Sequence, residues 1–145
     1  MNVLFFGNWG LGYLVLKKLL ISDKINIVGV VTQYDEYIED KYYNIVYNEA
    51  ILNGLLTFRC IDEVPSDIVA VSDLGLSVFF NQIFDDSLLS IIDILNVHAS
   101  LLPKHRGRTP IFWQLKEGSG FIGVTIHFVD LAIDTGPIYN QKKFN

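Results

Sequence analysis

Short apolar runs alternate with polar segments along the chain and predict the strands of a sheet. The first two runs are residues 3–6 and the almost continuous "INIVGVV" at 25–31. Between them, residues 13–21 space their leucines as a helix would, around two lysines. The strand–helix–strand order predicts a βαβ unit. The continuous second run indicates a strand that is buried on both faces of a parallel sheet.

The middle of the chain continues this alternation. We expect a loop over the acidic, tyrosine-rich residues 33–43, a helix over 44–53 that Gly54 ends, and a short strand over 55–58. Residues 62–73 fit either a strand or a helix, because Pro65 interrupts them. Two further buried strands are predicted at 74–80 ("LGLSVFF") and 93–99 ("DILNVHA"), and between them a helix capped by Asp85 or Asp86.

The last third of the chain predicts one more helix and two more strands. The helix begins near Pro110, a residue favoured in a first turn. "GVTIHFVD" at 123–130 alternates as a half-buried strand does, and "GPIYNQKKF" at 136–144 reads as the final strand. The class is therefore α/β: one domain over residues 1–145, built on an open, mostly parallel Rossmann-like sheet with helices on both faces.

Composition excludes several classes of protein. Half of the residues are apolar, the net charge is −5, and no apolar run is long enough to span a membrane. A chain with this charge has no broad cationic surface for nucleic acid. The single cysteine, Cys60, has no partner for a disulfide and none at metal-ligand spacing. We expect a cytoplasmic protein that binds no metal, membrane or nucleic acid.

The glycines after the first strand suggest an anion site more than a dinucleotide site. Their spacing is G-x-x-G-x-G, whereas the dinucleotide motif is G-x-G-x-x-G, and no acidic residue directly ends the second strand. Gly10, Leu11 and Gly12 nevertheless open a helix, whose free N–H groups suit a substrate phosphate. A tight turn that needs small residues explains the same pattern.

Two polar residues end the strand at 93–99. Asn96 and His98 are two residues apart, so they share a face at the carboxyl edge of the sheet, where ligands bind in such folds. An amide donor beside a histidine suits a developing oxyanion, and Asp134 in "DTG" offers a carboxylate to hold the imidazolium. Taken singly, the first two could be a structural pair and Asp134 an ordinary turn residue.

Three segments together resemble the catalytic region of folate-dependent formyltransferases: "NVHASLLPKHRGRTPIFWQL", "GVTIHFVD" and "IDTGPIYNQ". The resemblance implies the formyltransferase fold, with Asn96, His98 and Asp134 as the catalytic residues. It also implies 10-formyltetrahydrofolate as formyl donor, a primary amine as acceptor and no metal. The donor's pterin is then expected against two loops, at Phe79, Phe80, Asn81, Gln82, Ile83, Val129, Asp130 and Ile133. His127 is expected to be a structural or supporting residue.

Within that family, "RGRTP" and "VTIHFVD" look more like the sugar formyltransferases than the methionyl-tRNA type. We therefore expect a nucleotide-linked amino sugar as acceptor, its phosphate met by Gly10, Leu11, Gly12, Arg106 and Arg108. Glycinamide ribonucleotide is an alternative acceptor. Family members continue with further strands and a helix, so we expect a C-terminally incomplete domain. A non-catalytic folate- or partner-binding module and a possible homodimer remain open.

Overall fold

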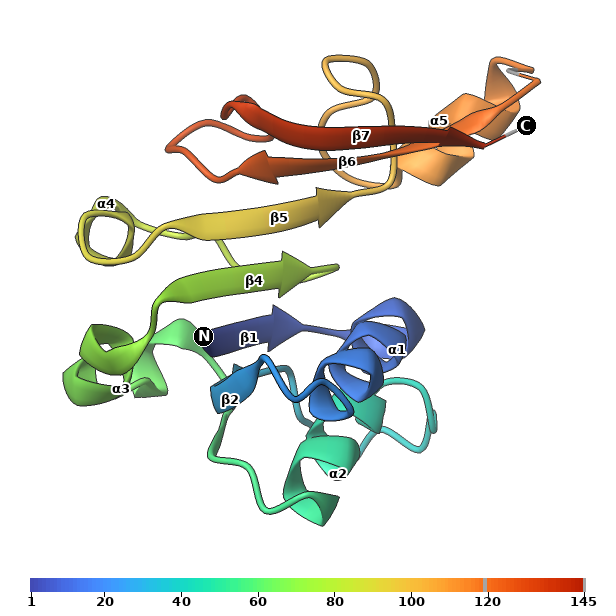
Figure 1. Cartoon of the computed structure of the whole chain (residues 1–145). Helices are drawn as coiled ribbons and strands as arrows, with labels where there is room; N and C mark the ends of the chain where they lie inside the picture. The colour runs from blue at the N-terminus through green and yellow to red at the C-terminus, as the bar shows by residue number, and fades with distance from the viewer. Residues whose placement is uncertain (119, 145) are drawn as a thin grey trace.

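The computed structural model describes residues 1–118 and 120–144, and these form a seven-stranded sheet in the order β3-β2-β1-β4-β5-β6-β7 (Figure 1). Strands β1 to β5 are parallel to one another, whereas β6 pairs antiparallel with both β5 and β7. The predicted open and mostly parallel sheet is confirmed. The strands are β1 (Asn2–Gly7), β2 (Asn26–Val31), β3 (Thr57–Phe58), β4 (Leu74–Val78), β5 (Ile94–His98), β6 (Ile122–Phe128) and β7 (Ile138–Phe144).

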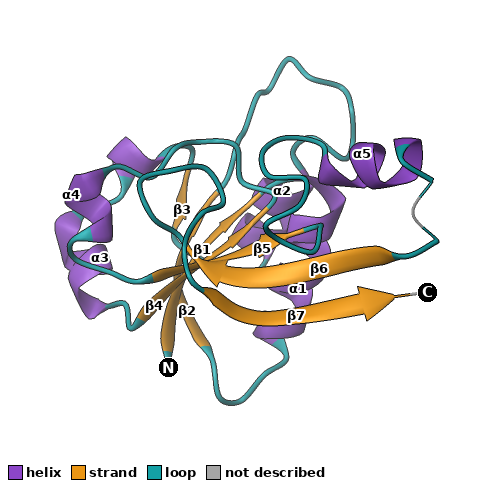
Figure 2. Cartoon of the chain, turned by 90° about the horizontal axis from the view of Figure 1, so that it is seen from above, coloured by secondary structure: helices purple, strands orange, loops and turns teal. Residues whose placement is uncertain are grey.

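Helices cover both faces of the parallel strands, as predicted. Figure 2 shows α1 (Trp9–Leu20) and α2 (Ile45–Leu52) on one side, and α3 (Ser66–Val71) and α4 (Asp86–Leu89) on the other. Each side has its own buried apolar cluster, around Phe5 and Leu16 on the first and around Phe6 and Leu88 on the second. A short 3-10 helix (Ile61–Glu63) precedes α3, and α5 (Pro110–Lys116) follows the loop after β5. None of these helices is long and apolar enough to cross a membrane.

The structure corrects some of the predicted boundaries. Strand β4 ends at Val78, two residues early, because Phe79 adopts a positive φ of 54° that a strand cannot continue. Helix α1 begins at Trp9, so Gly10, Leu11 and Gly12 lie inside its first turns. The ambiguous segment 62–73 is largely helical. Asp85 does cap α4, since its carboxylate accepts the N–H of Leu88 at 3.0 Å.

Strand β6 buries its polar set of side chains. Thr125 and His127 are 0% and 2% exposed, while the apolar residues that alternate with them are only partly buried. The Thr125 hydroxyl donates to the carbonyl of Ser100 at 2.6 Å and accepts the N–H of Leu102 at 3.0 Å. This face of β6 therefore holds the loop that follows β5.

The register of the sheet aligns four side chains in one row. Phe6 on β1 is paired with Ser77 on β4, Ser77 with Asn96 on β5, and Asn96 with His127 on β6. Directly paired residues share a face, so the row turns polar where it reaches β4 and stays polar through β6. Asn96 thus has a polar neighbour on each side.

Candidate active site

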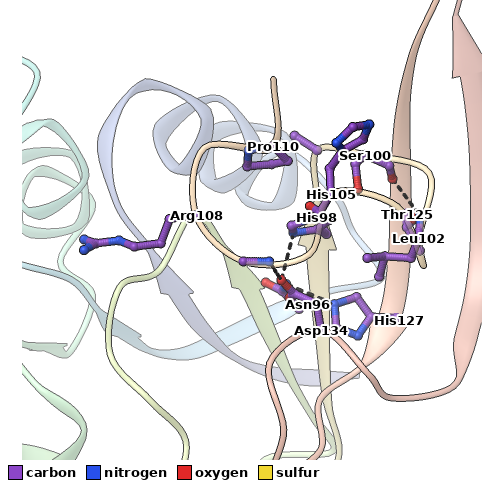
Figure 3. Close-up of polar contacts among 12 residues, drawn as sticks. Asn96, His98, Ser100, Leu102, His105, Arg108, Pro110, Thr125, His127 and Asp134 are labelled. Carbon is purple, nitrogen blue, oxygen red and sulfur yellow. Dashed lines mark hydrogen bonds and ion pairs between the residues drawn. The ribbon is translucent and has the colours of Figure 1, made fainter. Parts of the chain in front are cut away.

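The three residues predicted to be catalytic lie together on the face of β5 that α3 and α4 also cover. Asn96 and His98 come from β5, and Asp134 from the loop between β6 and β7 (Figure 3). Asp134 Oδ2 is 3.4 Å from His98 Nδ1, and Asp134 Oδ1 accepts from Asn96 Nδ2 at 3.5 Å. The fold therefore brings together side chains from β5 and from a loop 38 residues further along the chain.

His127 joins this group, although its sequence pattern indicated only a supporting residue. Its Nε2 is 3.2 Å from Asn96 Nδ2 and 3.4 Å from Asp134 Oδ1. Its Nδ1–H donates to the backbone carbonyl of Phe128 at 2.9 Å, which leaves Nε2 facing the other two side chains. The signal that could have found it is the pairing of two strands, because His127 lies directly opposite Asn96.

The loop after β5 lies against His98 and Asp134 and supplies a backbone contact to each. His98 Nε2 lies 2.8 Å from the carbonyl of His105, and Gly107 N–H donates to Asp134 Oδ2 at 2.7 Å. Both ring nitrogens of His98 thus face acceptors, the pattern that an imidazolium requires. His105 itself is mostly buried: 11% of its side chain is exposed, and its Nε2 is 3.4 Å from Glu117 Oε2.

Charge in the site is concentrated on Asp134. Burial alone would raise the pKa of this carboxyl, but the hydrogen bonds from His127 and Gly107 and the charges of His98 and His127 outweigh burial and lower the pKa. Burial alone would lower the pKa of His127. Its hydrogen bonds to Asp134 and the Phe128 carbonyl, with the nearby carboxylate charges, outweigh that effect and raise the pKa. The site thus favours a carboxylate with a cationic partner.

Trp9 and Phe79, just past the ends of β1 and β4, and Asp134, in the loop between β6 and β7, adopt left-handed backbone conformations. Their φ angles are 53° at Trp9, 54° at Phe79 and 53° at Asp134. Each such residue costs on the order of 1–3 kcal/mol, and such residues persist only where the surrounding contacts fix them. For Asp134 those contacts are the ones just described. Gly136 permits the same loop, because a Cβ there would collide with the carbonyl oxygen of Phe128.

The predicted donor-binding loops present different groups to solvent. In the first, Gln82 accepts the N–H of Ile61 at 3.0 Å, and Asn81 is bonded to both Asn8 and Gln33, so these two side chains are engaged within the protein. Ile83 is 83% exposed. With these amides engaged, the polar groups of this loop that are left to meet a ligand are those of its backbone.

The second loop contributes Val129, Asp130 and Ile133. Val129 packs against the same apolar cluster as Phe80, so the two predicted loops converge on one region of the core. Asp130 accepts a hydrogen bond from Thr135 at 2.6 Å, and Ile133 is 67% exposed. The donor-binding role of both loops remains a prediction.

The residues predicted to bind the acceptor are not part of the hydrogen-bonded group around Asp134. Gly12 N–H is bonded to the carbonyl of Asn8, as the helix requires, while Gly10 and Leu11 precede it in the first turn of α1. Arg106 and Arg108 are exposed, and in Figure 3 the side chain of Arg108 extends away from the trio. Their role also remains a prediction.

Two further features of the described residues bear on ligands. Residues 1–118 and 120–144 hold no group of three or more side chains that could bind a metal. A cavity of about 240 Å³ opens between α3 and α4, lined in part by Leu4, Phe6, Val69 and Leu88. Asn96, His98 and Asp134 are not among its lining residues, so this cavity is separate from the candidate active site.

Known proteins with similar sequences are formyltransferases. The formyl transferase family model matches residues 1–145. The chain is 31% identical to methionyl-tRNA formyltransferase of Ureaplasma urealyticum serovar 10 over 150 residues, and 34% identical to that of Bacillus mycoides over 151. Each alignment covers 97% of this chain, but 49% and 48% of the relatives. The chain therefore spans about half the length of these relatives.

Solved structures share the fold. Phosphoribosylglycinamide formyltransferase from Anaplasma phagocytophilum superposes with a TM-score of 0.78 at 24% identity, over 99% of this chain and 71% of that one. A sugar N-formyltransferase from a Shewanella species gives 0.72 at 23% identity, over 100% and 57%. At these identities the likeness establishes the architecture and leaves the acceptor open.

Proposed function

This chain belongs to the formyl transferase family, and from that membership we propose that it transfers a formyl group from 10-formyltetrahydrofolate to a primary amine. The observation that carries the proposal is the convergence of Asn96, His98, His127 and Gly107 on the carboxylate of Asp134. Such a preorganised set of donors around one carboxylate suits a reaction that develops an oxyanion and moves a proton.

Each residue of the trio has a separate task in this proposal. The acceptor amine adds to the formyl carbon, and Asn96 Nδ2–H and the His98 imidazolium stabilise the charge that develops on the formyl oxygen. Asp134 orients His98 and takes up the amine's proton through water. Collapse of the adduct breaks the bond from carbon to the donor nitrogen, which gains a proton. The formyl group is then an amide on the acceptor.

The donor is expected against the two loops that meet near Phe80 and Val129. Both residues pack on one apolar cluster, which offers support for a flat ring. Backbone N–H and carbonyl groups of the first loop are suited to its polar edge, because the side chains of Asn81 and Gln82 are bonded elsewhere.

For the acceptor we propose a nucleotide-linked amino sugar. The start of α1 offers N–H groups at Gly10 and Leu11, and the loop that carries Gly107 also carries the exposed cations Arg106 and Arg108. These two elements suit phosphate. The net charge of −5 opposes the broad electrostatic attraction on which nucleic-acid binding depends.

A second acceptor, methionyl-tRNA, is favoured by a different observation. The sequence relatives at 31–34% identity are named as methionyl-tRNA formyltransferases. A panel of acceptors separates the candidates: a nucleotide-linked amino sugar, the same sugar without its nucleotide, glycinamide ribonucleotide and methionyl-tRNA. We expect formylation of the first and much less of the second.

Folate binding should be titrated on the same preparation. Binding of the donor without transfer to any amine would support a non-catalytic module. Absence of both binding and transfer would overturn the proposed function.

A further inference from the structure

We propose that Ser77 is a positioning residue, whose hydroxyl fixes the carboxamide of Asn96 with its nitrogen toward Asp134. This inference rests on the proposed function and adds a residue outside the trio. Ser77 Oγ donates to Asn96 Oδ1 at 2.9 Å, across the paired strands β4 and β5. A hydroxyl that donates to this oxygen holds the oxygen on the β4 side, and the NH₂ group must then face β6.

Because Ser77 is buried, its hydroxyl depends on Asn96 for a hydrogen bond. Ser77 is 2% exposed, and its neighbour on the other side, in β1, is the apolar side chain of Phe6. A buried hydroxyl with an apolar neighbour on one side is expected to use the polar neighbour on the other, because an unmade hydrogen bond is costly there. Asn96 Oδ1 is that partner.

His127, on the opposite side of Asn96, is the reason why the orientation of the Asn96 carboxamide needs to be fixed. His127 Nε2 lies 3.2 Å from Asn96 Nδ2. When His127 is protonated, Nε2–H becomes a donor and competes for the amide oxygen of Asn96. A free carboxamide would then turn over and direct its oxygen toward His127, and the oxyanion would lose its donor. The hydroxyl of Ser77 opposes that turn.

Ser77→Ala removes the hydroxyl and adds no bulk, so it tests the idea directly. We expect kcat to fall about fivefold to tenfold, the change that losing one ordinary hydrogen bond gives, with KM for the donor unchanged. The matched control is Ser72→Ala, at the C-terminal end of α3. It also deletes a serine hydroxyl that is bonded, to the carbonyl of Ile68 at 2.7 Å, but has no link to Asn96. It should leave kcat at the parental value.

A double mutant separates positioning from general destabilisation. If Ser77 acts only through Asn96, then adding Ser77→Ala to Asn96→Ala should change the residual kcat by less than twofold. A further fivefold loss in the double mutant would show that Ser77 acts on its own account and would overturn the proposal. Equal kcat for Ser77→Ala and the parent would do the same.

A readout that needs no activity keeps this inference distinct from the proposed function. The side-chain NH₂ of Asn96 gives a pair of ¹⁵N-correlated NMR signals. We expect a single pair in the parent and in Ser72→Ala, and shifted or doubled signals in Ser77→Ala. An unchanged pair in Ser77→Ala would refute the positioning role. A parent that formylates no amine would refute the proposed function, while the NMR comparison would still decide the role of Ser77.

Discussion

Asn96 and His127 face each other across the β5–β6 pair, with Asn96 Nδ2 3.2 Å from His127 Nε2. The Phe128 carbonyl holds the proton of a neutral His127 on Nδ1, so Nε2 can accept from Asn96 only while the ring is neutral. Once protonated, Nε2–H is directed to Asp134 Oδ1, 3.4 Å away. Protonation of His127 therefore frees one amide hydrogen of Asn96 for substrate.

The pair of His127 and Asp134 predicts how stability depends on pH. The pKa of His127 is raised above its usual 6.5, so its contribution is complete below 6.5 and is lost as pH rises through the folded value. The pKa of Asp134 is lowered below 3.8, so its contribution is present above 3.8 and is lost as pH falls through its folded value. Both contributions coexist from about pH 4 to about 6.5.

Thermal unfolding of the parent and of His127→Gln at a series of pH values measures this effect. We expect the difference in Tm to be largest near pH 5–6 and to shrink by pH 9. A difference that grows above pH 7 would mean that the sign is wrong.

Asn96→Ala should reduce kcat by a factor on the order of 10²–10³, because it deletes the amide donor assigned to the oxyanion. The fold should persist, since the strand hydrogen bonds of β5 do not use this side chain. A formyl-transfer assay and far-UV circular dichroism test both parts. Asn48→Ala, on the exposed side of α2, is the control that should keep parental activity.

His98→Asn keeps a polar side chain of similar reach and removes the titratable ring. We expect a large loss of kcat and the disappearance of the limb of the pH–rate profile that reports the protonated imidazole. The profile of kcat/KM from pH 5 to 9 is the measurement. If the variant keeps the parental limb at reduced amplitude, then another group is the one that titrates.

Gly136→Ala should displace Asp134 while leaving the parallel strands in place. An alanine Cβ would overlap the backbone oxygen of Phe128, which has no freedom to move because its strand is paired on both sides. We expect a strong loss of activity and a Tm lower by several degrees. Gly120→Ala, whose Cβ would meet nothing within 4 Å, is the matched control.

From the exposed edge of strand β7 we predict that the protein self-associates as its concentration rises. All seven of its residues are exposed, including Tyr139 at 66%, and its outer edge has no partner strand among residues 1–118 and 120–144. Such an edge is a template for pairing, which Lys142 and Lys143 blunt only in part. Light scattering over a concentration series should show a dimer, and Tyr139→Lys should weaken it. A monomer at every concentration would contradict this expectation.

Patterns within single strands predicted the parallel strands of the core and two residues of the candidate site, Asn96 and His98. Apolar runs with β-branched residues identify strands, and residues two apart, such as Asn96 and His98, must share a face. Asp134 was a candidate as a carboxylate on a glycine turn, and the motif resemblance then assigned it to the predicted catalytic residues. Ser77 and His127 could not be assigned, because their roles follow from which strands are adjacent and in what register, and periodicity within one strand does not contain that information.

The left-handed backbone of Asp134 ties its local strain to the presence of its four partners. At φ 53° a glycine would relieve the strain of an L side chain, at the cost of greater freedom in the unfolded chain. Glycine would also delete the carboxylate on which Asn96, His98, His127 and Gly107 converge. Descendants that keep these partners should therefore keep the aspartate, whereas descendants that lose them lose the contacts that hold a locally unfavourable residue in place.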